Sequence, residues 1–149
     1  QRAFEERRVA KRYLGLVRGV PPAQIAVDRA LRKGSNGAEQ TALTHVERRA
    51  ILKRRYSWVE ARPVTGRSHQ IRRHLRHLRC PLIGDVKYGD GRQNRHFRHE
   101  YDFHRLALHA VEITLPHPRS EASVCVRAPL TSDLQRLVSS MGLHAHLER

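Results

Sequence analysis

A repeated alternation of apolar and polar residues with a period of two most limits the possible folds. Residues 11–19, KRYLGLVRG, place Tyr13 and Val17 on one side of an extended chain and Leu14 and Leu16 on the other. Segments rich in Thr, Val, Tyr and Trp predict further strands over residues 25–31, 41–49, 56–62, 105–116 and 123–127. In the segment 105–116, residues 107, 109, 111, 113 and 115 are expected on one face. The pattern therefore predicts a sheet.

From Ser68 the apolar period becomes helical, because Ile71, Leu75 and Leu78 stand at positions i, i+4 and i+7. Ser68 is the expected N-cap. The pair Cys80-Pro81 is expected to end the helix, since the residue before a proline is disfavoured in the helical conformation. A second short helix is predicted over residues 132–141. Strands combined with inserted helices indicate the α+β class.

Three segments fall outside these patterns. Residues 34–40 and 84–104 are polar and rich in glycine, and we predict that both are surface loops. Residues 1–10 have mixed charge and no Gly or Pro, so they are predicted to be the end of a helix. A chain that begins inside a helix, without an initiator methionine or a signal peptide, is expected to be part of a longer protein.

The charge balance indicates the class of partner. Lys and Arg number 29 against 14 Asp and Glu, which gives a net charge of +15 with histidine neutral. Such an excess suits a phosphate-rich partner, because basic side chains placed on phosphates release counterions. An anionic membrane is the rival partner, but no long apolar span or Lys-rich amphipathic helix supports it. Two distant cysteines without CxxC spacing indicate reduced thiols in a cytoplasmic protein.

The first predicted helix carries most of the candidate site residues. Arg72 lies beside its apolar stripe, and a part-buried guanidinium there needs a carboxylate or a phosphate as partner. Arg73 and Arg76 point more openly to solvent, where a solvated basic face is the alternative to a binding role. His69, His74 and His77 fall on three sides of this helix and the chain has no HExxH, so no metal site is predicted.

Four blocks of the sequence resemble the RluA-like pseudouridine synthases. PVTGRSHQIRRHL, residues 63–75, and CPLIGDVKYGD, residues 80–90, resemble the signature of this family. KRYLGLVRG resembles its tyrosine-bearing strand, and RLALHAVEITLPHP, residues 105–118, resembles its late core strand. Residues 84–97 are most similar to the tRNA pseudouridine synthase C subfamily, which is credited with modifying uridine 65 of tRNA.

The resemblance implies a fold and a reaction. The family has a mixed, largely antiparallel sheet with flanking helices, and residues 1–149 would form the C-terminal portion of its single catalytic domain. Its members break the N-glycosidic bond of a uridine, turn the base and reattach it through carbon, and the resemblance implies no metal or organic cofactor. The implied partner is RNA, in particular tRNA, and the full-length protein is expected to be a cytoplasmic monomer that binds no membrane.

The resemblance also implies roles for individual residues. Tyr13 matches the active-site tyrosine, which lies against the target base and is proposed to move a proton; otherwise it is an ordinary half-buried strand aromatic. Arg72 matches the arginine that pairs with the catalytic aspartate, and Ile71 is expected to wall the pocket. The residues expected to bind RNA are Lys11, Arg67, His69, Arg73 and Arg76.

One departure from the family's pattern concerns the nucleophile. The family's aspartate lies in an HRLD-type motif upstream of the tyrosine strand, whereas HRL occurs here only at residues 104–106, followed by Ala107. Asp85 and Asp90 belong to the other motif, so neither is a candidate nucleophile. We therefore expect the isolated chain to be inactive. The alternative is a non-catalytic basic RNA-binding module that has lost the nucleophile, while a ribosome-associated basic protein would not require the matched blocks.

Overall fold

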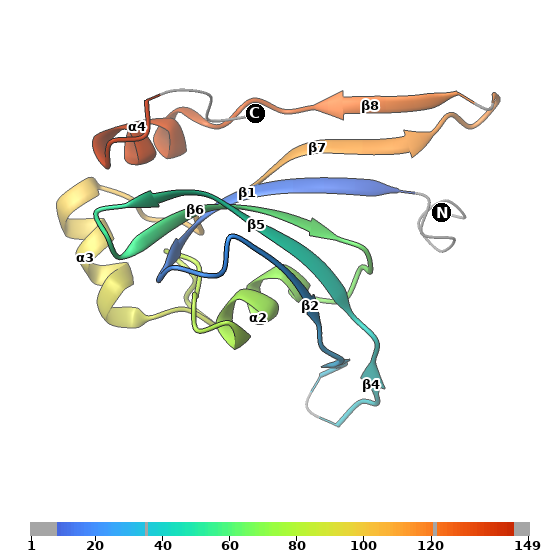
Figure 1. Ribbon diagram of the computed structural model, residues 1–149, viewed down its shortest axis with the longest axis horizontal. Coiled ribbons are helices and arrows are strands. Elements are labelled where there is room, and N and C mark those ends of the chain that lie inside the picture. Colours follow the sequence, from blue (N-terminus) through green and yellow to red (C-terminus); the bar gives the residue numbers. More distant parts are fainter. Residues whose placement is uncertain (1–8, 35, 121, 145–149) are drawn as a thin grey trace.

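The computed structural model describes residues 9–34, 36–120 and 122–144. Within these residues a six-stranded sheet has the order β2-β5-β6-β1-β7-β8, and each pair of neighbouring strands is antiparallel (Figure 1). The strands are β1 (Ala10–Arg18), β2 (Gln24–Asp28), β5 (Leu43–Leu52), β6 (Tyr56–Pro63), β7 (Leu108–Pro116) and β8 (Ser123–Arg127). The predicted α+β class with a largely antiparallel sheet is confirmed.

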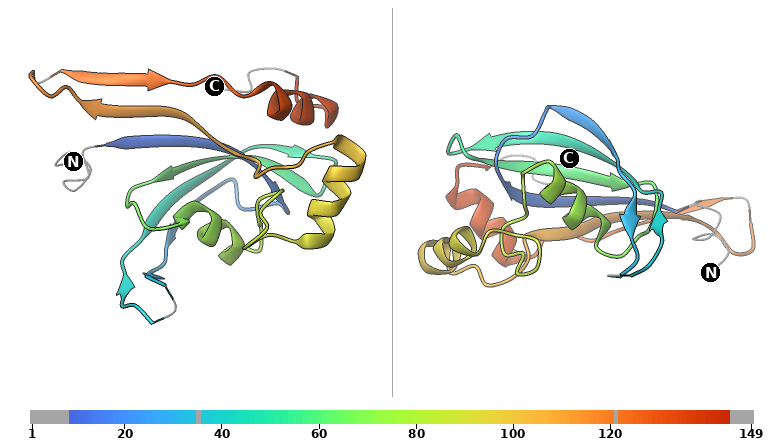
Figure 2. Two further views of the ribbon diagram at one scale, coloured as in Figure 1. Left: turned by 180° about the vertical axis from the view of Figure 1, so that it is seen from behind. Right: turned by 90° about the horizontal axis from the view of Figure 1, so that it is seen from below.

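Helices cover both faces of the sheet. Helix α2 (Gln70–His77) lies below the sheet in Figure 1, α4 (Ser132–Ser140) lies above it, and α3 (Gly91–Tyr101) lies at one end. The two short strands β3 (Leu31–Arg32) and β4 (Glu39–Gln40) form a separate hairpin on the α2 side of the sheet, as both views in Figure 2 show. The helices of the described part of the chain are too short or too polar to span a bilayer.

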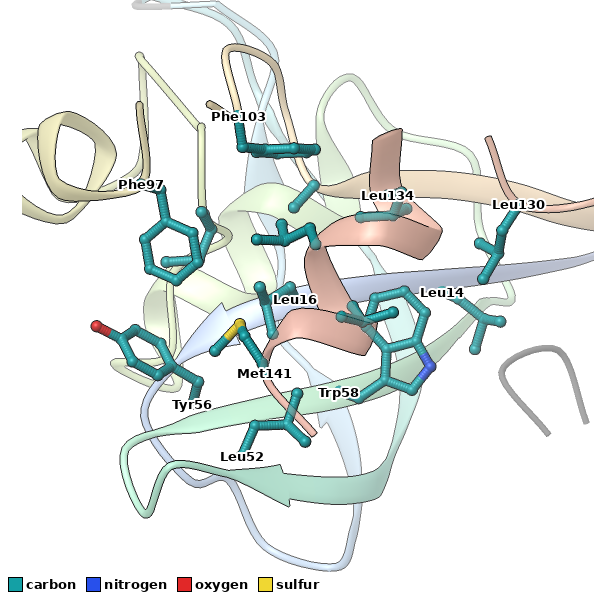
Figure 3. Close-up of a cluster of buried hydrophobic side chains, with 14 of the residues drawn as sticks. Leu14, Leu16, Leu52, Tyr56, Trp58, Phe97, Phe103, Leu130, Leu134 and Met141 are labelled. Atoms are coloured by element: carbon teal, nitrogen blue, oxygen red, sulfur yellow. The ribbon is translucent and has the colours of Figure 1, made fainter. Parts of the chain in front are cut away.

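The period-two alternation of β1 divides the core into two clusters. Leu14 and Leu16 pack with Trp58 and with residues of α3 and α4 on one face, as the close-up in Figure 3 shows. Val17 packs on the other face with residues of β5, β6 and α2, and Tyr13 contacts the edge of this second cluster. The predicted division of β1 is therefore confirmed, and it places Tyr13 on the same side of the sheet as α2.

The loop predicted over residues 84–104 is wrong for residues 91–101, which form α3. The carboxylate of Asp90 caps this helix by accepting hydrogen bonds from the N–H groups of Arg92 and Gln93. Only Asn94 and Phe97 of α3 are buried, so the apolar stripe is too thin to stand out in the sequence. Residues 34–40 include β4, so the loop predicted there is shorter and forms the tip of the β3–β4 hairpin.

Other predicted boundaries shift by a few residues. The N-cap of α2 is His69, with φ of 53° and no side-chain cap, so the prediction of Ser68 is wrong. The helix ends at His77 and the next turn closes through Arg79 in the left-handed conformation, before the Cys80-Pro81 pair. The strand predicted over residues 25–31 is divided between β2 and β3. The helix predicted over residues 1–10 falls largely outside the described residues, and residue 10 begins β1.

A β-bulge in β7 changes which side chains face the site. Arg12 pairs with Glu112 and Tyr13 pairs with Ala110, so Val111 is an extra residue with no partner of its own. Val111 is buried in the same cluster as Leu14, whereas Ile113 lines a hollow on the Tyr13 side of the sheet. The prediction that residues 107–115 present one continuous face is therefore wrong beyond the bulge.

Leu134 and Val86 differ in burial, so shortening each side chain to Ala should affect stability differently. Leu134 of α4 is fully buried against the sheet, whereas Val86 is 83% exposed. We expect Leu134→Ala to lower the free energy of unfolding by about 2–5 kcal/mol, and Val86→Ala to change it by less than about 0.5 kcal/mol. Urea unfolding followed by circular dichroism measures both variants. Equal effects would contradict the assignment of α4 to the core.

Candidate functional site

A hollow of about 290 Å³ lies between β1 and the start of α2, and we call it the site hollow. Its lining includes Tyr13 from β1 and Ile71 and Arg72 from α2, so the structure brings these three sequence candidates together. The lining also includes three of the five residues expected to bind RNA, namely Lys11, Arg67 and His69. Apolar and basic side chains therefore surround one opening.

Gln70 builds the wall of the site hollow. Its buried amide oxygen accepts hydrogen bonds from the hydroxyl of Thr65 at 2.6 Å and from the N–H of Arg67 at 3.1 Å. Its amide nitrogen donates to the carbonyl of Leu43 and to the hydroxyl of Thr44, both at 2.9 Å. One side chain thus holds the loop before α2 against β5, which fixes where the helix begins.

The guanidinium of Arg72 is bound on one edge by Asp85. Its Nε donates to Oδ2 and its Nη2 donates to Oδ1, each over 2.8 Å. The Asp85 side chain is 1% exposed and the Arg72 side chain 20% exposed. The ring of Tyr88 lies 5.0 Å from the guanidinium carbon. Two hydrogen bonds and a ring contact hold the guanidinium in one orientation beside the site hollow.

The surroundings of Asp85 keep its carboxylate charged. Burial alone would raise the pKa of Asp85, but the hydrogen bonds and charge of Arg72 and the N–H groups of Tyr88 and Lys87 bring the net pKa below its usual value. The same pair raises the pKa of Arg72, through the hydrogen bond to Asp85. The two groups are therefore a stable ion pair at neutral pH.

This ion pair was not anticipated from the sequence, which led us to expect a carboxylate from outside the chain as the partner of Arg72. Asp85 already occupies Nε and Nη2, whereas Nη1 makes no hydrogen bond with the described residues. The available signal was the position of Asp85 two residues after the apolar run 81–83, since a buried aspartate nearly always has a partner.

No Asp or Glu of the described residues lines the site hollow. A second hollow of about 360 Å³ shares Lys11 and Tyr13 with it and does include Glu112. That carboxylate accepts a hydrogen bond from Arg127 at 2.9 Å. The described residues also contain no group of three His, Cys, Asp or Glu side chains placed to hold a metal ion.

The remaining two RNA-binding candidates lie elsewhere. Arg73 and Arg76 line a separate groove beside α2, together with residues of the β3–β4 hairpin. His69 stays at the rim of the site hollow, with its Nδ1 3.2 Å from the hydroxyl of Tyr88. The five candidates therefore divide between two separate openings beside one helix.

The buried ion pair predicts how stability depends on pH. Asp85→Asn should lower the free energy of unfolding at pH 7 by about 3 kcal/mol, because it leaves Arg72 without its charged partner. Since the folded pKa of Asp85 is lowered, the wild-type advantage should be present above the unfolded pKa of about 3.9 and be lost as the pH falls through the folded pKa.

Urea unfolding of both proteins between pH 7 and pH 2 measures this difference. The exposed Asp28 offers a matched control, and Asp28→Asn should change stability by less than about 0.5 kcal/mol. A gap between wild type and Asp85→Asn that stays constant over the whole pH range would contradict the assignment.

Comparisons with known proteins show the family of this chain. The sequence model of the family described as RNA pseudouridylate synthase matches residues 1–77, just over half of the chain. The chain is 34% identical over 154 residues to tRNA pseudouridine synthase C of Vibrio parahaemolyticus, covering 90% of this chain and 63% of that protein. Its Haemophilus ducreyi counterpart is 35% identical over 160 residues, covering 95% and 66%. The chain thus spans slightly less than two thirds of the length of these relatives.

Solved structures show the same fold. Human RNA pseudouridylate synthase domain containing 1 has a TM-score of 0.68 and 28% identity, over 89% of this chain and 60% of that one. Human RNA pseudouridylate synthase domain containing 4 has a TM-score of 0.77 over 95% and 65%, with 24% identity, and supports the fold alone. The family match over more than half of the chain, the relatives and the shared fold together show that this chain belongs to the RNA pseudouridylate synthase family.

Proposed function

We propose that this chain is the C-terminal part of the catalytic domain of an enzyme that isomerises uridine to pseudouridine in tRNA, at uridine 65. The observation that carries the proposal is that Tyr13, Ile71 and Arg72 line one hollow together with basic side chains. The relatives named tRNA pseudouridine synthase C support tRNA as the substrate. We further propose that the enzyme acts in the cytoplasm, as a monomer without a cofactor.

The site hollow suits a single base taken out of its stack. Its volume of about 290 Å³ is close to the lower end of small-molecule pockets, about 300 Å³. Removing a base from its stack costs a few kcal/mol, which contact with a ring and an apolar wall offsets. In the proposed complex Tyr13 lies against the target base, Ile71 forms the apolar wall, and Lys11, Arg67 and His69 attract the phosphates beside it.

Arg72 is proposed to orient the nucleophile. The nucleophilic carboxylate would come from the part of the relatives that this chain does not span. A guanidinium within about 4–6 Å favours the charged form of such a carboxylate, and Nη1 is available to donate a hydrogen bond. Because Asp85 already compensates the charge of Arg72, we propose that Arg72 acts mainly through this directed hydrogen bond rather than through an uncompensated positive charge.

A second candidate is a non-catalytic module that binds RNA. It is favoured by the observation that no carboxylate of the described residues lines the site hollow. This alternative predicts salt-sensitive tRNA binding by the chain, no pseudouridine formation by the full-length protein, and no loss of affinity in variants of Tyr13 or Arg72.

Pseudouridine formation separates the two candidates. We expect the full-length protein to convert uridine 65 of a tRNA transcript, detected by carbodiimide labelling and primer extension, and not to modify a transcript with cytidine at that position. Arg72→Ala should slow the reaction by at least about 100-fold, the usual cost of removing one oriented donor from an active site. Arg95→Ala, which removes an exposed arginine of α3, is the control.

These assays run well below the melting temperature of each variant, since Arg72→Ala also breaks the pair with Asp85. Modification of a different uridine would refute the proposed position, uridine 65, but would still support pseudouridine formation as the reaction. An unchanged rate in Arg72→Ala would refute the role of Arg72.

The hydroxyl of Tyr13 is open to a separate test. If it moves a proton in the reaction, Tyr13→Phe should lower kcat by about 100-fold or more, and KM should change little because the ring is retained. Tyr13→Leu should additionally raise KM, because the ring contact with the base is lost. A Tyr13→Phe variant with wild-type kcat would leave the tyrosine with a contact role alone.

A further inference from the structure

We propose that a second opening beside α2, adjacent to the site hollow, binds the sugar-phosphate backbone of the tRNA that flanks the target nucleotide; this inference rests on the proposed function. The surface is a groove of about 570 Å³ between α2, residues 29–32 and Tyr88, and we call it the hairpin groove. In Figure 2 the β3–β4 hairpin projects on the same side of the sheet as α2. The arginines that line the groove are Arg29, Arg32, Arg73, Arg76 and Arg79.

The charge of the hairpin groove is almost uncompensated. Among the described residues that line it, Glu39 is the one acid; it is exposed and lies 3.8 Å from Arg32, a type of ion pair that contributes little. In the described part of the chain, none of the other four groove arginines has a carboxylate within 4 Å. Several arginines elsewhere do have such partners: Arg12 and Arg62 bind Glu60, and Arg105 binds Asp133. Unpaired positive charge therefore gathers along this groove.

Two of the groove arginines are held in place without losing their capacity for an anion. Nη1 of Arg73 donates to the carbonyl of Arg32 at 3.0 Å, and Nη1 of Arg76 donates to the carbonyl of Tyr88 at 2.9 Å. A guanidinium has five N–H donors, so each keeps donors for a phosphate. Restraint before binding lowers the entropy that is lost when an anion binds.

The side of the hairpin groove that faces the core is also held in place before any anion binds. His74 is fully buried, and burial lowers its pKa so that the imidazole is neutral. Its Nε2 lies 3.0 Å from the carbonyl of Arg29, and its Nδ1 lies 2.9 Å from the hydroxyl of Thr44. A neutral imidazole has one donor and one acceptor, and both are used here. Arg29, the residue after β2, is thus held against α2 by a hydrogen bond.

The hairpin groove and the site hollow meet at Tyr88. This residue lines the groove, and it also contacts His69 and Arg72, which line the site hollow. Arg72 and Arg76 are about 6 Å apart along the helix axis. A strand with its target base in the site hollow would therefore bring its next phosphates over Tyr88 to the groove arginines. This continuity favours RNA over an acidic protein as the occupant.

The salt dependence of tRNA binding tests the proposal. The double variant Arg76→Ala/Arg79→Ala removes two exposed side chains of the groove. Binding of this chain to a fluorescent tRNA transcript is measured by anisotropy over a series of salt concentrations. We expect the slope of log Kd against log salt concentration to fall by between about 1.4 and 2, because each lost phosphate contact removes about 0.7–1 from the slope.

The matched control is Arg95→Ala/Arg98→Ala, which removes the same charge from the exposed side of α3. An equal change of slope in this control would overturn the proposal, since bulk charge alone would then explain the binding. An unchanged slope in the groove variant would also overturn it, and weaker binding of a poly-glutamate probe by that variant would then identify a protein partner. Absence of pseudouridine with the wild-type full-length protein would refute the proposed function separately, because the slope is measured from binding alone.

Discussion

The ion pair of Arg72 with Asp85 connects the site to the rest of the fold. Arg72 comes from α2, and Asp85 comes from the segment that follows it. The backbone carbonyl of Asp85 accepts a hydrogen bond from the side-chain nitrogen of Asn94 in α3, and the side-chain oxygen Oδ1 of Asn94 accepts one from the N–H of Gly84. Because α3 packs through Phe97 into the large core cluster, the orientation of the guanidinium depends on the packing of the opposite face of the sheet.

A buried charge pair of this kind is costly to desolvate and is kept only where its geometry is well satisfied. Asp85 meets this condition, since it accepts two hydrogen bonds from Arg72 and two from backbone N–H groups. What it contributes to function is orientation, because a long, flexible arginine side chain becomes a fixed donor. Asp85 compensates the positive charge of Arg72, and the two hydrogen bonds between them fix the direction of the remaining N–H donors of Arg72.

Helix α2 has only eight residues, yet they serve three different tasks. Ile71 and Leu75 pack into the core, Ile71 and Arg72 line the site hollow, and Arg73 and Arg76 line the hairpin groove. Such a short helix has little stability of its own. Gln70 and His74 stabilise it through hydrogen bonds to β5 and to Arg29, the residue after β2.

Local patterns were sufficient for much of the fold. The strands β1, β5, β6 and β8 and the helix α4 follow from apolar periodicity, because that signal depends only on neighbouring residues. Helix α3 was missed because its buried side is mainly Asn94 and Phe97, and the bulge at Val111 was missed because it appears only once β7 pairs with β1. Each of these errors involves a feature that takes its form from a distant part of the chain.

The same division holds for the site. Tyr13, Ile71 and Arg72 were predicted from contiguous motifs that resemble those of the family, and their faces follow from strand and helix periods. Only the tertiary structure decided that Asp85 binds Arg72, and that Arg73 and Arg76 belong to a different opening from Lys11 and Arg67. Composition and period determine which residues are buried or basic, whereas the partner of a charge depends on where the folded chain brings it.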